Sequence, residues 1–517
     1  MTIRDFFDEA VSSCGSRVFL RWHDGERWVA MTYAEAEAAV IRTCAALKRL
    51  GLTKARESGY PMRVAIMREN CPEWIIVYLA VAGTGLIVVP VDPHLRPPEA
   101  RHIIEDSGAA LVIADDRLAE LLGAAGLKTK VAYAGEFAEA VAALSPGELA
   151  EGEAWWRENR PELDDLASIV YTSGTTGAPK GAMLTHGNFT ANVDQTFTRV
   201  MFYPTDHFLL ALPLFHVFAF TLNFLVPLRK TAEISFARTM RSIPVDMAEL
   251  RPTVLMAVPL LAELLYARAR DIVCRLRVLG LGGAPSSKAT LEALVAAGVY
   301  VLEGYGITEC APGVAYPDQS KYVVGTVGTP LDGIDWRIVN SDETGAGELR
   351  VKGPNVMKGY WNNLAETERA FDSDGFYRTG DIVRPGKDGN LQICGRIKAL
   401  IVNREGKNIY PEEIERAIRR CPLVAEALVV GYRMSGEVGE HVGAIVVPNP
   451  EAVKSARPEL TDPGEIAQLV RREVQALCHD LLTEYKLPRK VEVRFVPLEH
   501  TSSMKVKRFL YARALDE

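Results

Sequence analysis

Residues 166–181 read Leu-Ala-Ser-Ile-Val-Tyr-Thr-Ser-Gly-Thr-Thr-Gly-Ala-Pro-Lys-Gly. The apolar run Leu166–Val170 predicts a buried strand, and the glycines and hydroxylated residues after it predict a loop. Glycines let backbone N–H groups approach an anion, hydroxyl groups add hydrogen-bond donors, and Lys180 adds a positive charge. An ordinary turn rich in Gly, Ser and Thr seldom combines all three, so the loop predicts a phosphate-binding site. Its Gly-x2-Gly-x2-Lys spacing is not that of a Walker A motif, so nucleotide binding has to be argued on another fold.

The composition predicts a globular protein with more than one domain. The chain has 517 residues, of which 48% are hydrophobic, and this length exceeds what one core usually supports. Its eight cysteines are scattered without a Cys-x-x-Cys pair, and its first residues lack a signal-peptide pattern, so we expect reduced thiols and a cytoplasmic location. The net charge of −7 argues against a nucleic acid as partner, because proteins that bind nucleic acids normally carry a basic surface.

One uncharged segment has the length of a membrane-spanning helix. Residues 208–228 contain no Lys, Arg, Asp or Glu over 21 positions. Pro213 and Pro227 would break a continuous helix, so the segment favours a buried strand, a loop and a buried helix over a membrane span. Peripheral contact with a membrane and formation of a homodimer are both compatible with the sequence.

Apolar strand-like runs alternate with helical patterns over the first part of the chain. Arg63–Met67, Leu86–Pro90 and Ala110–Ala114 are separated by helix-like segments, and a similar alternation returns over residues 253–302. Repeated βαβ spacing predicts parallel sheets covered by helices, here as two α/β subdomains.

The pattern changes twice in the last third of the chain. From about Val324, short strands with Gly/Asp turns predict a β-rich, barrel-like subdomain, and after Arg396 the pattern predicts a small α+β unit. The predicted α/β fold therefore has a large N-terminal domain over residues 1–397 and a small C-terminal domain over residues 398–517.

Six further segments complete an ordered set of motifs: LGGAP at 281–285, GYGITE at 304–309, YRTGD at 377–381, GRIK at 395–398, GKNIYPEEIE at 406–415 and SMKVKR at 503–508. Together with residues 172–181 they resemble the motifs of the adenylate-forming superfamily, which includes acyl-CoA synthetases, peptide-synthetase adenylation domains and firefly luciferase. The chain is most similar to a bacterial fatty-acid or related acyl-CoA ligase. The resemblance implies that the small domain is mobile and that ATP binds between the two domains.

The activity that the resemblance implies has two steps. A carboxylic acid attacks ATP to give acyl-AMP and pyrophosphate, and the acyl group then passes to the thiol of coenzyme A, giving acyl-CoA and AMP. The first step puts negative charge on five-coordinate phosphorus, which cations and oriented donors must stabilise. The implied cofactor is Mg²⁺, ATP and CoA are co-substrates, and the partners are small molecules.

The resemblance also assigns residues to ATP and metal. Tyr305 would stack on adenine, Thr308 would lie near the α-phosphate, and Glu309 with Thr172 would contact Mg²⁺. The residues assigned to ATP are Thr172, Ser173, Gly174, Thr175, Thr176, Gly177, Lys180, Gly283, Ala284, Pro285, Glu303, Gly304, Tyr305, Gly306, Asp381 and Arg396. Without the resemblance, a tyrosine like Tyr305 is as often a core aromatic, and Asp381 is more often a turn residue.

The small domain contributes the residue that completes the site. Lys505 matches the lysine that holds the carboxylate and α-phosphate, with Met504 in place of the common glycine and Lys507 as the alternative. Lys398 stands at the hinge position of the family. Gly406 and Lys407 belong to the loop that would face the site during thiol transfer, where Ala399 and Val402 depart from the family pattern.

The acyl group is expected to bind among apolar side chains. Phe218, Phe220, Cys310 and Ala311 are the predicted pocket residues, and His216 matches a histidine that gates the acyl and thiol tunnels in relatives, although a lone histidine is more often a hydrogen-bonded core residue. Thr308, Glu309, His216 and Lys505 are the predicted catalytic residues. Because no charge follows His216 until Arg229, a medium- or long-chain fatty acid is the leading substrate class. An aryl or cyclic acid is the alternative, as is an adenylating enzyme that loads a carrier protein.

Overall fold

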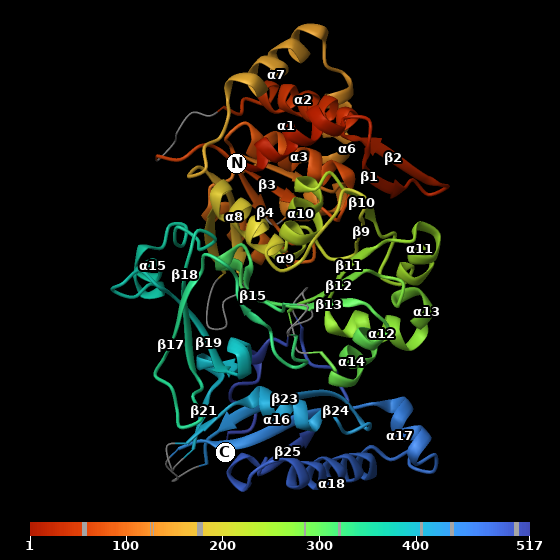
Figure 1. Ribbon diagram of the computed structural model, residues 1–517, viewed down its shortest axis with the longest axis vertical. Coiled ribbons are helices and arrows are strands. Elements are labelled where there is room, and N and C mark those ends of the chain that lie inside the picture. Colours follow the sequence, from red (N-terminus) through yellow and green to blue (C-terminus); the bar gives the residue numbers. More distant parts are fainter. Residues whose placement is uncertain are drawn as a thin grey trace.

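The structure is a computed structural model that describes residues 1–53, 59–124, 126–127, 129–172, 179–283, 286–318, 322–403, 407–434, 439–500 and 506–516. It has two parts of unequal size, with the small C-terminal domain, in blue, below the large N-terminal domain (Figure 1). The mixed α/β fold with parallel sheets and a separate small domain confirms the predicted fold class.

In the described part of the chain, the first sheet of the large domain has six strands in the order β6-β5-β3-β4-β7-β8. All neighbours are parallel except β7 and β8, which form the antiparallel pair that carries the predicted phosphate-binding loop, residues 172–181, called the phosphate loop below. The predicted apolar runs coincide with β3, β4 and β5 to within one residue at each end. The strand bounds are β3 Arg63–Met67, β4 Ile87–Pro90, β5 Leu111–Ala114, β6 Lys130–Tyr133, β7 Leu166–Thr172 and β8 Lys180–Thr185.

The second sheet has seven strands among the described residues, in the order β13-β12-β11-β9-β10-β1-β2. It is parallel from β13 to β1, and β2 closes one edge as a hairpin with β1. The strand bounds are β1 Val18–His23, β2 Trp28–Thr32, β9 His207–Leu210, β10 Glu233–Phe236, β11 Val254–Ala257, β12 Val278–Leu281 and β13 Tyr300–Glu303.

Helix α3 packs between the two sheets. It spans Pro72–Gly83 and contacts β3 and β4 of the first sheet and β1 of the second. A proline stands in its first turn, where no N–H is needed, and every residue after Glu73 is buried, as expected of a helix that is apolar on all sides. Further helices of this domain are α1 Ile3–Cys14, α2 Tyr33–Arg49, α4 Pro97–Ser107, α5 Asp116–Ala124, α6 Ala134–Ala142, α7 Pro146–Glu158, α8 His186–Phe197, α11 Ile243–Leu250, α12 Pro259–Arg268, α13 Arg270–Val273, α14 Lys288–Ala296 and α15 Leu364–Ala370.

The uncharged segment 208–228 folds into the core. Strand β9 is followed by α9 Val217–Ala219, the π-helix η1 Phe220–Leu225 and α10 Val226–Arg229. This confirms the predicted strand, loop and helix. Among the described residues, no helix combines the length and the apolar character that a bilayer crossing requires.

The last part of the large domain is built from antiparallel strands. A three-stranded sheet contains β14 Tyr305–Gly306, β15 Gly313–Tyr316 and β16 Thr329–Pro330, and a four-stranded sheet contains β17 Asp335–Val339, β18 Gly347–Lys352, β19 Tyr377–Pro385 and β20 Leu391–Arg396. Asp372, before β19, accepts hydrogen bonds from Arg337 on β17 at 2.6 Å and Arg350 on β18 at 3.0 Å. One buried carboxylate thus ties two strands of the four-stranded sheet to the segment leading into β19.

Asp372→Asn is expected to destabilise the large domain by about 1.5–3 kcal/mol, because it removes charge-assisted hydrogen bonds. Burial opposes ionisation of Asp372, but hydrogen bonds from Arg337, the Phe376 N–H and Arg350 outweigh it and hold its pKa below the usual range. A lowered folded-state pKa gives stability that is complete above the unfolded pKa of about 3.9 and is lost as pH falls below it. The difference between the unfolding midpoints of wild type and variant should therefore be full at pH 7 and shrink below about pH 4. A difference that grows on acidification would contradict this assignment.

The small domain has its own core. Its three-stranded sheet pairs β23 Val424–Tyr432 antiparallel and β25 Lys490–Val493 parallel with β24 His441–Pro448. Helices α16 Pro411–Ile418 and α18 Pro463–Leu481 contribute apolar residues to its core, which draws on residues between 401 and 493. Its other elements are β21 Ile401–Val402, β22 Asn408–Ile409, α17 Pro450–Ala456 and the short 3-10 turns η6 Glu484–Lys486 and η7 Arg508–Leu510. The large domain has the 3-10 turns η2 Thr308–Cys310 and η4 Lys387–Gly389, and η5 Ile397–Ala399 connects the two domains.

Candidate active site

The residues predicted for adenine and ribose lie together. The Tyr305 hydroxyl donates to Oδ2 of Asp381 at 2.6 Å, and Nε of Arg396 lies 2.9 Å from Oδ1 of the same carboxylate. Asp381 and Arg396 face each other across β19 and β20, so the sheet register sets their pairing. Burial, then the Asp381 charge, raises the pKa of Tyr305 well above its usual value. Tyr305 therefore remains a hydroxyl donor, and one carboxylate organises both neighbours.

The phosphate loop is closed at its base by the β7–β8 hairpin. Thr172 pairs with Lys180 in the sheet register, and the Thr172 hydroxyl donates to the Lys180 carbonyl oxygen at 3.4 Å. The Lys180 ammonium forms an ion pair with Glu366 of α15 and lies 5.4 Å from the centre of the Tyr360 ring. The loop residues between them lie outside the described residues: Ser173, Gly174, Thr175, Thr176 and Gly177.

Glu309 lies on the short turn η2 and is held from two sides. The Met357 N–H donates to the Glu309 carbonyl oxygen at 2.8 Å, and the Tyr360 hydroxyl donates to Oε1 of the Glu309 side chain at 2.8 Å. The Tyr377 hydroxyl is 3.3 Å from that of Tyr360. Thr308, the other predicted catalytic residue of this motif, begins the same turn.

Tyr360 and Glu366 were missed by reasoning from the sequence. They belong to a stretch between two strands with no charge run or glycine loop that would indicate a site. Their partners Glu309 and Lys180 are separated from them by 51 and 186 positions, so no local pattern points to the contacts.

The predicted glycines lie where side chains would collide. A Cβ on Gly304 would come within 2.5 Å of the Tyr316 ring, and one on Gly306 within 2.4 Å of the Pro312 carbonyl oxygen. Gly283 has a φ of +89°, which favours glycine. Ala284 and Pro285, the rest of this motif, lie outside the described residues.

Glu303 binds the residue that follows the LGGAP motif. Its carboxylate accepts hydrogen bonds from the Ser286 N–H at 3.1 Å and from the Tyr322 hydroxyl at 3.1 Å. Burial raises the pKa of Glu303, and these hydrogen bonds and the Arg416 charge oppose the rise. The structure thus shows a supporting role for Glu303, while its contact with ATP stays a prediction.

Phe218 and Phe220, two of the predicted acyl pocket residues, have different surroundings. Phe218 lies against Gly282, where a Cβ would be 3.2 Å from the Phe218 ring. Phe220 instead packs in an aromatic cluster with Tyr78 at 4.5 Å and Phe189 at 4.9 Å between ring centres. Its place in the acyl pocket therefore stays a prediction.

Cys310 and Ala311 are fully buried at the end of η2. Burial raises the pKa of the Cys310 thiol well above its usual value, so it remains a neutral apolar group. The Ala311 carbonyl oxygen accepts from the Thr221 hydroxyl at 2.8 Å, which links this turn to η1. His216 precedes α9, and its ring is 4.6 Å from that of Phe215.

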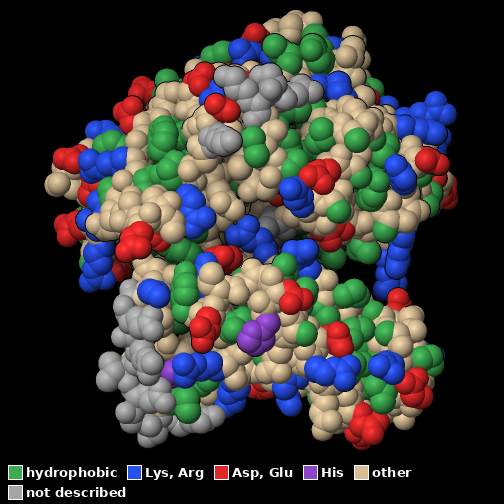
Figure 2. All heavy atoms as spheres, turned by 60° about the horizontal axis from the view of Figure 1, so that its bottom comes forward, with side chains coloured by type: hydrophobic (Ala, Val, Ile, Leu, Met, Phe, Trp, Pro, Cys, Tyr) green, Lys and Arg blue, Asp and Glu red, His purple; other side chains and the backbone are tan. Residues whose placement is uncertain are grey.

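The small domain presents α16 to the active site. Arg508 donates to Glu415 at 2.7 Å and lies 3.7 Å from Glu412. Burial raises the pKa of Glu412, with Arg508 opposing and Asp381 of the large domain adding to the rise. Glu412 also lies against β20, because a Cβ on Gly395 would come within 2.5 Å of its carboxylate, so Arg508 packs on a helix that meets the GRIK motif. Figure 2 shows Lys and Arg side chains along the boundary between the two domains.

The remaining predicted residues of the small domain are only partly described. Lys505, Met504 and Gly406 lie outside the described residues. Lys398 lies in η5, between β20 and β21, as expected of a connector, and the Lys407 ammonium lies 4.8 Å from the centre of the Tyr485 ring.

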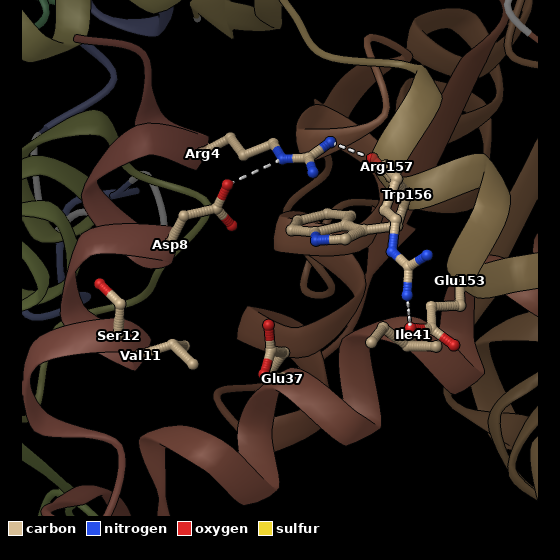
Figure 3. A pocket seen from close by; sticks show the side chains of 9 residues that line it. All are labelled: Arg4, Asp8, Val11, Ser12, Glu37, Ile41, Glu153, Trp156 and Arg157. Carbon is tan, nitrogen blue, oxygen red and sulfur yellow. Dashed lines mark hydrogen bonds and ion pairs between the residues drawn. The ribbon is translucent and has the colours of Figure 1, made fainter.

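Two further cavities are found among the described residues. One of about 230 Å³ is formed by α1, α2 and α7, where Arg4 pairs with Asp8 at 3.3 Å beside Trp156 (Figure 3). The other, of about 300 Å³, lies between the β-rich part and the small domain and includes Arg384 and Arg416 in its wall. Neither contains a residue of the predicted ATP site.

The two domains match two parts of one family. Residues 7–361 match the AMP-binding enzyme family, and residues 413–505 match the AMP-binding enzyme C-terminal domain. The chain belongs to the AMP-binding enzyme family. This confirms the predicted membership of the adenylate-forming superfamily.

Curated relatives of this AMP-binding enzyme include ligases for different acids. It is 32% identical over 486 residues to a feruloyl-CoA synthase of an Amycolatopsis species, covering 90% of each chain. It is also 32% identical over 510 residues to a long-chain-fatty-acid–CoA ligase of Salmonella typhimurium, covering 90% of this chain and 86% of the relative.

Solved structures extend the likeness to nearly the whole chain. ATP-bound MatB from Rhodopseudomonas palustris is 28% identical with a TM-score of 0.82, covering 99% of each chain. The O-succinylbenzoate CoA synthetase MenE from Bacillus subtilis is 24% identical with a TM-score of 0.79, covering 97% of each chain, and shows the fold alone. This AMP-binding enzyme is an AMP-forming acid–CoA ligase, and ATP and CoA as co-substrates are consistent with its family.

Proposed function

We propose that this AMP-forming acid–CoA ligase activates a medium- or long-chain fatty acid. The observation that carries the proposal is the uncharged stretch from His216 to Leu228, which forms a loop, α9, η1 and most of α10. Phe218 of this stretch lies against Gly282 of the LGGAP motif, beside the expected path of the acyl chain. A site without a charged group here suits an acid whose only charge is the reacting carboxylate. The long-chain-fatty-acid–CoA ligase relative supports the same class.

Residues of both domains divide the adenylation step between them. Asp381, Arg396 and Tyr305 would hold the nucleoside of ATP, and Lys180 with the phosphate loop would hold the phosphates. Lys505 would arrive from the small domain to hold the acid carboxylate beside the α-phosphate. We assign the described pose of the small domain to this step, because Arg508, three residues after Lys505, bonds to Glu415 of α16, and Glu412 of the same helix lies against Gly395 beside Arg396. Rotation at Lys398 would then bring Gly406 and Lys407 toward the site for thiol transfer.

The described residues fit a magnesium ion bound together with ATP. These residues contain no group of three or more His, Cys, Asp or Glu side chains that could hold a metal ion. Glu309 and Thr172 offer the one or two hard oxygen ligands that Mg²⁺ takes from a protein when phosphates and water supply the rest. Bound there, Mg²⁺ would neutralise phosphate charge as pyrophosphate leaves.

The proposal is tested by a pyrophosphate-release screen. Straight-chain acids from short to long, benzoate and hydroxylated cinnamates are each supplied with ATP and Mg²⁺, with and without CoA. We expect the highest kcat/KM for a medium or long chain, with acyl-CoA and AMP as products. Turnover that needs an acyl carrier protein in place of CoA would contradict the acceptor, and a preference for cinnamates would contradict the substrate class.

An oxygenated aryl acid is the second candidate, and one buried residue favours it. Asn223 lies in η1, a π-helix, an element that occurs frequently at functional sites. Both amide atoms of Asn223 are buried, and neither has a hydrogen-bond partner in the described structure. A hydroxyl or methoxyl group of an acyl substrate reaching η1 would satisfy one of them. The feruloyl-CoA synthase relative agrees with this class.

Asn223→Leu separates the two candidates. Under the leading proposal it leaves kcat/KM for a fatty acid nearly unchanged and stabilises the protein by about 1–3 kcal/mol, since an unbonded buried amide is replaced by an apolar group of similar size. The measurements are kcat/KM for a fatty acid and a hydroxylated cinnamate, and the unfolding midpoint. A loss of about tenfold or more confined to the cinnamate would instead favour the aryl acid.

A further inference from the structure

Three of the ATP-site motifs meet at one side chain, Tyr360. Its segment is bonded on both sides: the Met357 N–H donates to the Glu309 carbonyl oxygen at 2.8 Å, and the Trp361 N–H donates to the Gly181 carbonyl oxygen at 2.7 Å. The Tyr360 backbone also pairs with that of Ala182 of β8 in an isolated antiparallel β-bridge. The segment therefore ties η2, which carries Glu309, to the strand that leaves the phosphate loop.

The Tyr360 side chain touches one functional group of each motif. Its hydroxyl donates to Oε1 of Glu309 at 2.8 Å, and its ring centre lies 5.4 Å from the Lys180 ammonium, within the range of a cation–π contact. A phenol, whose ordinary pKa is about 10, is protonated at neutral pH, so its hydroxyl is a donor to the carboxylate.

The hydroxyl of Tyr360 has one proton, and this proton fixes the direction of a short chain of hydrogen bonds. Because it is donated to Glu309, the contact of 3.3 Å between the two tyrosine hydroxyls has Tyr377 as donor. Tyr377 begins the YRTGD motif that ends at Asp381. The chain runs from Tyr377 through Tyr360 to Glu309, and each bond polarises the next.

A glutamate on a single 3-10 turn needs such support. Its side chain has several rotatable bonds, and holding it in one conformation costs free energy unless a partner selects that conformation. Tyr360 selects it by a bond to Oε1 and makes no bond to Oε2. The long side chain of Lys180 also needs partners that hold it in one conformation. In the described structure these partners are the Tyr360 ring and the Glu366 carboxylate.

We propose that Tyr360 is a positioning residue for adenylation: its hydroxyl orients the Glu309 carboxylate toward the metal bound with ATP, and its ring supports Lys180 beside the phosphates. This inference rests on the proposed roles of Glu309 and Lys180. It adds a residue to the site that lies in none of the seven sequence motifs.

Tyr360→Phe tests the hydroxyl alone, because the ring beneath Lys180 is kept. Losing a hydrogen bond to a charged group corresponds to roughly a 10- to 100-fold change. We expect ATP affinity, measured by calorimetry without acid or CoA, to fall by about this factor in excess Mg²⁺ and to stay unchanged in EDTA. The Mg²⁺ concentration for half-maximal pyrophosphate release should rise similarly, while acyl transfer from supplied acyl-AMP to CoA keeps its rate.

Four further variants complete the experiment. Tyr33→Phe is the matched control, since it removes another buried hydroxyl, which donates to the Ala232 carbonyl oxygen at 3.0 Å away from the site, and it should leave both readouts unchanged. Glu309→Gln should reduce the Mg²⁺-dependent affinity, and the double variant should be no worse than Glu309→Gln, because both changes remove one interaction. Tyr360→Leu should lower ATP affinity even in EDTA, since the support for Lys180 is also lost.

Each outcome has a distinct meaning. If Glu309→Gln shifts the Mg²⁺ dependence and Tyr360→Phe does not, Tyr360 is not a positioning residue and the role of Glu309 stands. If Glu309→Gln shifts nothing, the metal assignment and this inference both fall, while acyl-CoA formation by the wild type is judged separately from its products. Equal loss of thermal stability in Tyr360→Phe and Tyr33→Phe without a Mg²⁺ shift would show a structural role only and overturn the inference.

Discussion

Replacement of Lys505 by alanine is expected to lower the rate of acyl-adenylate formation by about 10²- to 10³-fold, the loss found when one group that stabilises developing charge is removed. Attack of the carboxylate on the α-phosphate brings two anions together, so a cation between them lowers the barrier. The described structure places the following segment suitably: Arg508 bonds to Glu415 of α16 at 2.7 Å, and Glu412 of the same helix lies against Gly395 of the GRIK motif. The measurement is single-turnover pyrophosphate release with saturating ATP and acid.

Separate measurement of the two half-reactions, together with the variants Lys507→Ala and Lys505→Arg, distinguishes the role of Lys505 from a general loss of activity. Transfer of the acyl group from supplied acyl-AMP to CoA should keep its rate in Lys505→Ala, because Lys505 is assigned to the first step only. Lys507→Ala should keep pyrophosphate release within a few-fold of wild type. Lys505→Arg keeps the charge but replaces a compact ammonium with a planar fork, so partial activity is expected. A large loss in Lys507→Ala with a normal Lys505→Ala would move the role to Lys507.

The fold could be predicted from the sequence where local pattern and burial agree. The runs that became β3, β4 and β5 are short, apolar and bounded by helix signals, so period and length alone identified them. The uncharged segment 208–228 was resolved by two prolines, which argued against a continuous helix. The order of strands in the sheets was not predicted, because pairings such as β1 with β10 join residues about 214 positions apart and no local pattern encodes them.

The candidate site was predictable only where residues belong to motifs. Tyr305, Asp381 and Arg396 were named from their motifs, and the structure joins them through one carboxylate. Tyr360 and Glu366 were not named, because their contacts to Glu309 and Lys180 depend on how a long connection folds back over the sheet. Local motifs identified the groups that would touch ATP, whereas the groups that support them became visible only in three dimensions.

Replacement of Asp381 by alanine is expected to lower kcat/KM for ATP by about 10²- to 10⁴-fold. Its carboxylate would accept both ribose hydroxyls, and each hydrogen bond to a charged group is worth about 1.5–3 kcal/mol. The same carboxylate holds the Tyr305 hydroxyl at 2.6 Å and Arg396 at 2.9 Å, so its loss also releases two other groups assigned to ATP. The measurement is the initial rate of acyl-CoA formation over a range of ATP concentrations, with CoA and acid saturating.

The comparison variants separate nucleotide binding from a general loss of structure. Asp381→Asn keeps the volume of the side chain and should lose most of the same kcat/KM, because a neutral amide accepts more weakly and its NH₂ group offers a donor where Tyr305 also donates. Tyr305→Phe removes one of the bonds and should cost less than either. Asp372→Asn, just before the same strand, also neutralises a buried carboxylate bonded to arginine, yet should leave the KM for ATP unchanged. If Asp381→Asn bound ATP as tightly as the wild type while Asp372→Asn did not, the ribose would have to be placed elsewhere, and the Tyr305–Asp381–Arg396 cluster would be a structural link between β14 and the β19–β20 pair.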